Sequence, residues 1–455
     1  MGLIGLVDLL DREGYSAKIL NYTLEKMLDR KFSLGRYLRK AKPSIVGVDL
    51  LWIVHSAGAI EILQFIKKQF PNIFTLLGGL SATYYAKEIM QNYDFIDGII
   101  QGEAEVPIIQ LLKHRSSLHE VPNLIYRENG RIKDNQITYV AKELDSLNFA
   151  KLQHVEHWKE YTQLIDKKVH TPFPLELVRG CPFNCIFCGG SHFTNQKVVK
   201  REKTIFRSPQ RVVDDIRELR NLFHVDLIHF GYGVYSGVEK YFLEIQKLIR
   251  EEKLEMNAGL EVWRLPINRQ FFQDFAKTYG TTKSVISYSP RSLSASYRQK
   301  FHSLIGRFDN SYAFSDDQFL SFLKNIHEIG LRVILFYDIG YPFETYYDIV
   351  KNLLGVIKIN LQNFSQKRRI ALYTEPIMIT PGSPADIIGH QFGLRSYTRT
   401  FKAHLELNLR TPANATPWDV GVNYRTDAIS SRGINYLIRA MWGINNLSYF
   451  SFLFF

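Results

Sequence analysis

The chain has 455 residues, of which 45% are hydrophobic and 22% are charged. This composition is typical of a folded protein, excludes wholesale disorder and leaves room for two or three domains. No apolar run reaches the roughly 20 residues that a membrane-spanning helix needs. The first residues carry neither the basic stretch nor the cleavage site of a signal peptide. We therefore expect a cytoplasmic protein without a membrane span.

The formal net charge is +12, which alone fits nucleic acid, an anionic surface or acidic small molecules as partners. Basic residues are spread along the chain, and their densest cluster, residues 197–207, follows the three cysteines. This cluster could face an anionic cosubstrate as well as RNA. We interpret it as a solvated basic face and expect no nucleic-acid partner.

The first ~135 residues alternate between short apolar runs and amphipathic stretches, a pattern typical of a parallel α/β sheet. Strands are predicted at residues 17–20, 44–49, 73–77 and 96–100. The helix that contains Ile62 and Ile66 should end near Pro71. Crossovers of this length favour a doubly wound, Rossmann-like sheet. Because the sequence starts directly with the helical residues 5–10, we expect the first strand of this sheet to be missing.

Residues 121–172 are predicted to connect two domains, with a hairpin at Asn129-Gly130 flanked by residues 124–126 and 137–140. After this segment the alternation of strands and helices returns. Strands are predicted near residues 175–178, 226–230, 256–260, 284–287, 331–336 and 369–373. Six strand–helix units indicate an open, partial (β/α)6 barrel of the TIM type, whose chemistry would lie on loops at the carboxyl ends of the strands. We assign residues 1–120 to the first domain, 173–365 to the barrel and 366–455 to a covering, substrate-binding region.

Capping signals predict where two helices of the barrel begin. Ser208 is followed by Pro209 at the first helical position, and Val212, Val213 and Ile216 then supply an apolar stripe. Ser315 and Gln318 form the pattern of a capping box.

The only three cysteines of the sequence, Cys181, Cys185 and Cys188, lie within eight residues in CxxxCxxC spacing. An odd, crowded set of this kind cannot form a disulfide framework. Three thiolates can hold a cuboidal iron–sulfur cluster and leave its fourth iron open for a ligand. A structural zinc ion is the alternative, and it would need a fourth ligand such as His192 or His170.

The segment from Leu175 to Cys188, with the aromatic Phe187 directly before the third cysteine, resembles the cluster loop of radical S-adenosylmethionine (SAM) enzymes. This resemblance implies that Cys181, Cys185 and Cys188 hold a [4Fe-4S] cluster and that Phe187 belongs to the cofactor site. It implies that SAM binds the open iron and is cleaved reductively to a 5′-deoxyadenosyl radical. It also implies an electron donor such as flavodoxin or ferredoxin.

Other positions match the family in part. Gly231 lies where relatives carry a glycine-rich turn with an acidic residue, but Gly231-Tyr232-Gly233 has none, so backbone carbonyls would have to bind the amino group of SAM. Ser287 and Ser289 occupy the place of a polar segment near the ribose and carboxylate of SAM. Residues 340–345 are similar to a Gly-x-Pro-x-Glu-Thr turn of the family, although Thr345 could simply cap the next helix.

The first domain is similar to the cobalamin-binding domain of one large subfamily, on the evidence of Gly78-Gly79 after a strand and of Gly102 in Gly-Glu-Ala-Glu. These glycines would let cobalamin approach the backbone. The Asp-x-His-x-x-Gly signature of a cobalt-ligating histidine is absent. His55 lies on a loop after a strand and could face the corrin, or it could be a structural histidine.

The resemblance implies a cobalamin-dependent methyltransferase that acts on an unactivated carbon of a small-molecule or natural-product substrate. The alternatives are a cobalamin-assisted radical cyclisation or rearrangement without methyl transfer, and a non-catalytic metal-binding scaffold. The sequence assigns no catalytic side chain.

Overall fold

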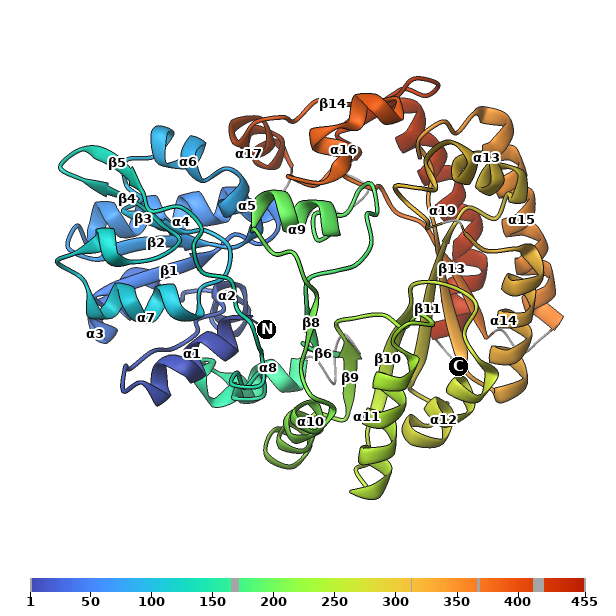
Figure 1. Ribbon diagram of the computed structural model, residues 1–455, viewed down its shortest axis with the longest axis horizontal. Coiled ribbons are helices and arrows are strands. Elements are labelled where there is room, and N and C mark those ends of the chain that lie inside the picture. Colours follow the sequence, from blue (N-terminus) through green and yellow to red (C-terminus); the bar gives the residue numbers. More distant parts are fainter. Residues whose placement is uncertain (1, 165–171, 312, 366–368, 412–420, 454–455) are drawn as a thin grey trace.

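The computed structural model describes residues 2–164, 172–311, 313–365, 369–411 and 421–453. Two α/β layers lie side by side, with the strands of residues 45–134 in one and those of residues 173–373 in the other (Figure 1). Within the described ranges, no helix is long and apolar enough to cross a membrane.

The first layer is a five-stranded sheet in the order β1-β2-β3-β4-β5. Its strands are β1 (Ile45–Asp49), β2 (Phe74–Gly78), β3 (Gly98–Ile100), β4 (Leu124–Glu128) and β5 (Arg131–Asp134). The first three are parallel, with Asp49 opposite Gly78, and β4 and β5 add an antiparallel edge. The predicted parallel α/β sheet is thus confirmed.

Two local predictions in this half are wrong. Residues 17–20 are not a strand, because Ile19 makes only an isolated bridge with Val155 between two helices. The hairpin at Asn129-Gly130 is present, but its return strand is β5 and not residues 137–140, because the turn is tight and pairs Arg131 directly with Glu128.

Helices flank this sheet along the chain. They are α1 (Gly2–Arg12), α2 (Tyr22–Leu28), α3 (Leu34–Ala41), η1 (Ile53–His55), α4 (Ser56–Gln69), α5 (Leu80–Tyr84), α6 (Ala86–Asn92), α7 (Glu105–Lys113) and η2 (Leu118–Glu120). The connection adds η3 (Leu152–His154) and α8 (Trp158–Leu164), which pack on the core of the second half. In α4, the side chains of Ile60, Leu63 and Ile66 point to the core, as the spacing of its apolar residues predicts.

The second layer is a six-stranded, all-parallel sheet in the order β13-β12-β11-β10-β9-β6. Its strands are β6 (Phe173–Leu175), β9 (Leu227–Phe230), β10 (Asn257–Val262), β11 (Val285–Arg291), β12 (Arg332–Tyr337) and β13 (Ile370–Tyr373). This is the predicted open (β/α)6 arrangement. A short antiparallel pair, β7 (Val178–Arg179) with β8 (Ile205–Phe206), extends from its β6 end.

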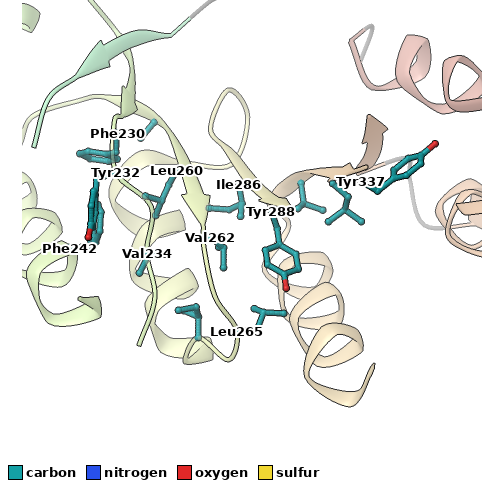
Figure 2. Close-up of a cluster of buried hydrophobic side chains, with 14 of the residues drawn as sticks. Phe230, Tyr232, Val234, Phe242, Leu260, Val262, Leu265, Ile286, Tyr288 and Tyr337 are labelled. Atoms are coloured by element: carbon teal, nitrogen blue, oxygen red, sulfur yellow. The ribbon is translucent and has the colours of Figure 1, made fainter. Parts of the chain in front are cut away.

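One face of this sheet is buried against helices, and Figure 2 shows part of the contact. Phe230, Leu260 and Ile286 from three neighbouring strands are almost completely buried. The alternate residues of β11, including Ser287 and Ser289, face the other way and are partly exposed. The alternation turns the polar side chains of the strands toward the interior of the open barrel.

The helices of this half are α9 (His192–Val198), α10 (Pro209–Phe223), α11 (Glu239–Glu251), α12 (Arg269–Tyr279), α13 (Ala295–Ile305), α14 (Asp316–Ile329) and α15 (Tyr346–Ser365). Ser208 caps α10 with Pro209 in its first turn, and Ser315 and Gln318 form the predicted capping box of α14.

The C-terminal residues contact both layers. They comprise α16 (Pro384–Ile387), η5 (Gly389–Phe392), β14 (Leu394–Ser396), α17 (Phe401–Arg410), β15 (Tyr424–Thr426) and α19 (Ser431–Leu453). Helix α19 packs on β13, whereas α17 packs on α4 and η1 of the first layer. Asn408 of α17 donates from Nδ2 to the Ile53 carbonyl at 2.7 Å.

Candidate functional site

The three cysteines lie on one loop, residues 181–188, which we call the cysteine loop. It leaves β7 and leads into α9, between the two sheets (Figure 1). Local hydrogen bonds fold it back on itself: the Cys188 amide donates to the Cys185 carbonyl at 3.1 Å, and the His192 amide donates to the Phe183 carbonyl at 2.8 Å. Ser191 then caps α9 through the Thr194 amide. Neighbours in the sequence thus close the turns, while Ile186 ties the loop to distant parts of the chain: its amide donates to Asp309 Oδ2 at 3.0 Å and its carbonyl accepts from the Ala385 amide at 2.9 Å.

Each cysteine sulfur is approached by a hydrogen-bond donor. The amide of Phe183 donates to Cys181 Sγ at 3.5 Å, and that of Gly190 donates to Cys188 Sγ at 3.3 Å. The guanidinium Nη2 of Arg264 donates to Cys185 Sγ at 3.5 Å. Such donors stabilise negative charge on thiolates and on iron–sulfur clusters.

Burial raises the pKa of the Cys181 thiol to about 12. The thiolate form that binds iron therefore needs the positive charge of the metal to exist at neutral pH.

A single-ion site is not preformed around these thiols. In the part of the chain that the structure describes, no three His, Cys, Asp or Glu side chains converge on one metal position. A cuboidal cluster distributes its thiolates over separate irons, so its ligands need not converge on one point. Of the two histidines considered as zinc ligands, His170 lies outside the described residues, and His192 is the first residue of α9.

Phe187 packs under the C-terminal region. Its ring lies 4.9 Å from that of Tyr341 and 5.2 Å from that of Tyr424, measured between centroids. Its carbonyl accepts from Thr380 Oγ1 at 2.7 Å. Phe187 thus fixes the cysteine loop to the barrel through Tyr341 and to the C-terminal region through Tyr424 and Thr380.

Gly231 follows β9 and donates its amide to the Leu175 carbonyl at 2.9 Å. A Cβ at this position would lie 3.0 Å from the same carbonyl oxygen, and a Cβ at Gly233 would lie 2.2 Å from the Trp263 ring. A side chain is therefore excluded at Gly233 and would crowd the neighbouring strand at Gly231. No carboxylate can project from this turn at either position.

A carboxylate lies on the next strand, β10. The side chain of Glu261 is exposed and accepts from Trp263 Nε1 at 2.8 Å. Glu261 pairs in register with Ser287 of β11, and Ser289 follows on the same face. These three polar side chains project toward the barrel interior, near its carboxyl end.

The turn after β12 caps the following helix. Thr345 Oγ1 donates to Asp348 Oδ2 at 2.7 Å, and the Asp348 amide donates back to Thr345 at 3.3 Å. Glu344 is fully buried and accepts from the Gly340 amide at 2.7 Å. Burial raises the pKa of Glu344 to about 8, so this carboxyl is largely protonated at neutral pH.

At the carboxyl edge of the first sheet, there is free space beside Gly78, whereas Gly79 packs against the backbone of Leu50. A Cβ on Gly78 would meet no atom within 4 Å, whereas Gly79 has φ +104° and its Cβ would lie 2.6 Å from the Leu50 carbonyl carbon. His55 is exposed on η1 after β1, and Trp52, the residue before η1, is exposed as well. A flat, largely apolar ligand could lie on this edge.

Gly102 belongs to a loop that reaches the second domain. Its amide donates to Thr83 Oγ1 at 2.8 Å. The next acidic residues pair across the domain boundary, Glu103 with Arg201 at 2.6 Å and Glu105 with Arg179 at 2.7 Å. The Gly102 loop thus contacts the residues on either side of the cysteine loop, since Arg179 precedes this loop and Arg201 follows it.

Comparison with known families agrees with this division of the site. A B12 binding domain model matches residues 1–112, and a radical SAM superfamily model matches residues 175–351. The chain belongs to the cobalamin-binding radical SAM proteins. Its cofactors are accordingly a [4Fe-4S] cluster, SAM and cobalamin.

Relatives of this radical SAM protein include an uncharacterized methyltransferase from Pyrococcus horikoshii, 23% identical over 79% of this chain and 73% of that one. The hopanoid C-3 methylase of Methylococcus capsulatus is 22% identical over 57% of this chain and 47% of its own length. An anaerobic magnesium-protoporphyrin IX monomethyl ester cyclase from Cereibacter sphaeroides is 27% identical over 41% and 30%. This chain thus spans about half or less of these last two relatives.

The same fold occurs in the radical SAM methyltransferase TsrM from Kitasatospora setae. Its structure with cobalamin and a [4Fe-4S] cluster matches 97% of this chain and 86% of its own at a TM-score of 0.69 and 13% identity. A second structure of TsrM holds tryptophan and a SAM analogue.

Arg264 and Glu261 were missed by the sequence analysis of this radical SAM protein. Arg264 reaches Cys185 from a loop 79 residues further along the chain, and its guanidinium lies 4.3 Å above the Phe183 ring. Glu261 lies one strand away from the turn in which an acid is expected. The alternation of β10, with Glu261 exposed between buried neighbours, is the signal that could have found it.

Proposed function

We propose that this protein is a cobalamin-dependent radical SAM methyltransferase that methylates an unactivated carbon of a small-molecule or natural-product substrate. The observation that carries the proposal is the cysteine loop, in which each of three thiols meets a hydrogen-bond donor. The loop stands beside a B12 binding domain. Several relatives are named methyltransferases or methylases.

We assign the iron ligands to Cys181, Cys185 and Cys188. When bound, the cluster supplies the electron that cleaves SAM. The residues of the chain bind and orient it: the amides of Phe183 and Gly190 and the Arg264 guanidinium stabilise charge on sulfur. Phe187 fixes the loop by packing.

The cosubstrate would lie over the interior face of the barrel. Ser287 and Ser289 offer hydroxyl groups for its ribose and carboxylate, and the exposed backbone at Gly231 offers a carbonyl. Glu261 offers the carboxylate that the Gly231 turn lacks, in reach of an ammonium group on the same face.

Cobalamin would lie on the carboxyl edge of the first sheet. The open space at Gly78 suits a corrin that approaches the backbone, while Gly79 and Gly102 shape the two neighbouring loops. The exposed Trp52 offers apolar surface to the ring. His55 lies on the same loop and is the candidate for contact with the corrin.

We further propose four parts with the limits 1–120, 121–172, 173–365 and 366–455, in which the sheets extend across two limits: β4 and β5 of the second part complete the first sheet, and β13 of the fourth part completes the second sheet. The family matches at 1–112 and 175–351 support the first and third. A flavodoxin or ferredoxin in the cytoplasm would supply the electron.

Anaerobic reconstitution with iron, sulfide and cobalamin tests the proposal. We expect about four irons per chain, one cobalt, and release of 5′-deoxyadenosine from SAM under strong reductant. Zinc in place of iron, or no reaction of SAM, would refute the proposal and favour a metal-binding scaffold.

The cyclase relatives favour one alternative, a cobalamin-assisted cyclisation or rearrangement. SAM labelled in its methyl group distinguishes the two reactions. Label in the product supports methyl transfer, and an unlabelled, rearranged product supports the alternative.

A further inference from the structure

Glu103 of the N-terminal domain holds Arg201 of the barrel domain from across the boundary. Arg201 Nε donates to Glu103 Oε1 at 2.6 Å, and Nη2 donates to Oε2 at 2.8 Å. The two side chains are only 8% and 3% exposed. A buried, bidentate pair has little freedom to move, because separating it would leave two uncompensated charges.

A second pair joins the same surfaces. Arg179 Nη1 lies 2.7 Å from Glu105 Oε1 and 3.4 Å from Glu103 Oε2. Arg179 stands two residues before Cys181. The start of the cysteine loop is therefore tied to the same two carboxylates.

Gly180 connects these ion pairs to the first thiol. It has φ +92°, and a Cβ there would lie 3.1 Å from Arg201 Cδ and 3.3 Å from the Lys203 carbonyl oxygen. The backbone next to Cys181 thus packs directly on the side chain that Glu103 holds. A shift of Arg201 would move the backbone from which the first iron ligand projects.

The segment that connects the two domains also binds this ion pair, through the backbone of Ala141. The Ala141 amide donates to Glu103 Oε2 at 2.7 Å, and Arg201 Nη2 donates to the Ala141 carbonyl at 2.7 Å. The Glu103 carboxylate therefore joins three parts of the chain: the first sheet, the connection and the barrel domain.

We propose that Glu103 and Glu105 are positioning residues for the cluster, which hold the backbone at Cys181 through Arg201 and Arg179. The cluster is retained in its proper geometry only while the N-terminal domain is docked on the barrel domain. This inference rests on the proposed cluster site, and it gives the Gly-Glu-Ala-Glu segment a role toward iron in addition to any contact of Gly102 with cobalamin.

The test uses the full chain, reconstituted anaerobically with iron and sulfide, and compares wild type with Glu103→Gln. Glutamine keeps the shape of the side chain but removes its charge. We expect iron release to a chelator to become about tenfold faster or more, the scale seen when residues that orient metal ligands are changed. The electron paramagnetic resonance spectrum of the reduced cluster should change as well, which a purely structural role would not require.

Asp97→Asn is the matched control. It breaks the Lys67–Asp97 pair, 2.6 Å long and partly buried, within the N-terminal domain. We expect it to lower the unfolding temperature but to leave iron release and the spectrum at wild-type values. Equal iron loss in both variants would overturn the inference, because general loosening of the domain would then explain the effect.

Glu105→Gln is the second variant, for use if Glu103→Gln does not fold. Its partner Arg179 is more exposed than Arg201, and we expect the same change at a smaller size. Wild-type release from the folded variant would overturn this inference alone. A wild-type chain that takes up no iron and sulfide would overturn the proposed function and this inference with it.

Discussion

The cysteine loop and the carboxyl edge of the N-terminal sheet are built in different ways. The turns of the loop are closed by bonds between residues close in sequence, such as that from the Cys188 amide to the Cys185 carbonyl. The sheet edge brings together Gly78, Gly102 and the loop around His55 from three strands. A local motif can be recognised in the sequence alone, even though distant residues such as Glu103 help to hold its backbone, whereas a site assembled from three strands becomes visible only in the fold.

The largest effect on activity should come from the loss of one iron ligand in the cysteine loop. We expect Cys185→Ala to lower the rate of SAM cleavage by about three orders of magnitude or more, because the three ligands act as a unit. Production of 5′-deoxyadenosine measures the effect. Thermal unfolding of the metal-free chain serves as the control and should hardly change, since the loop is held by its backbone. Normal turnover without this thiol would contradict the assignment.

Two adjacent glycines test the assembled site. Gly79→Ala should destabilise the N-terminal domain by about 1–3 kcal/mol from backbone strain alone, because Gly79 has φ +104° and no room for a Cβ. Gly78→Ala meets open space. It should fold like wild type and weaken cobalamin binding only. Chemical denaturation and cobalt content measure the two effects, and equal stability of both variants would contradict the local geometry.

The sequence analysis succeeded where signals are local or periodic. The strands of the barrel, the capping box at Ser315 and the cysteine spacing follow from neighbours within a few residues. It failed for residues 17–20, where an apolar run forms only one bridge at Ile19. Nor could it find Arg264, because no local pattern reports a contact with a sulfur 79 residues away.

That missed arginine gives the third prediction. Arg264→Gln should retain the cluster but lower its reduction potential, because the donor and positive charge at Cys185 Sγ stabilise the more negative reduced state. A shift of about 60 mV corresponds to a tenfold change for a one-electron couple. Arg264→Lys keeps the charge and should shift less. Redox titration monitored by electron paramagnetic resonance measures this, and an unchanged potential would show that Arg264 does not act on the cluster.

The last prediction concerns the pH dependence of stability, through Glu344 in the turn after β12. Its pKa is raised by burial from 4.5 to about 8, so the folded state holds a proton that the unfolded state releases above pH 4.5. The neutral carboxyl therefore favours folding most at low pH, and this stability is lost as pH rises toward 8. The slope for one proton is at most about 1.4 kcal/mol per pH unit.

Glu344→Gln removes this titration and keeps an oxygen that can accept from the Gly340 amide. The free energy of unfolding of wild type should fall relative to that of the variant between about pH 5 and 8. Taking the difference between the two proteins cancels the other titrating groups. Parallel curves across this range would mean that Glu344 is ionised in the folded protein, and that the turn is held by charge and not by a neutral hydrogen bond.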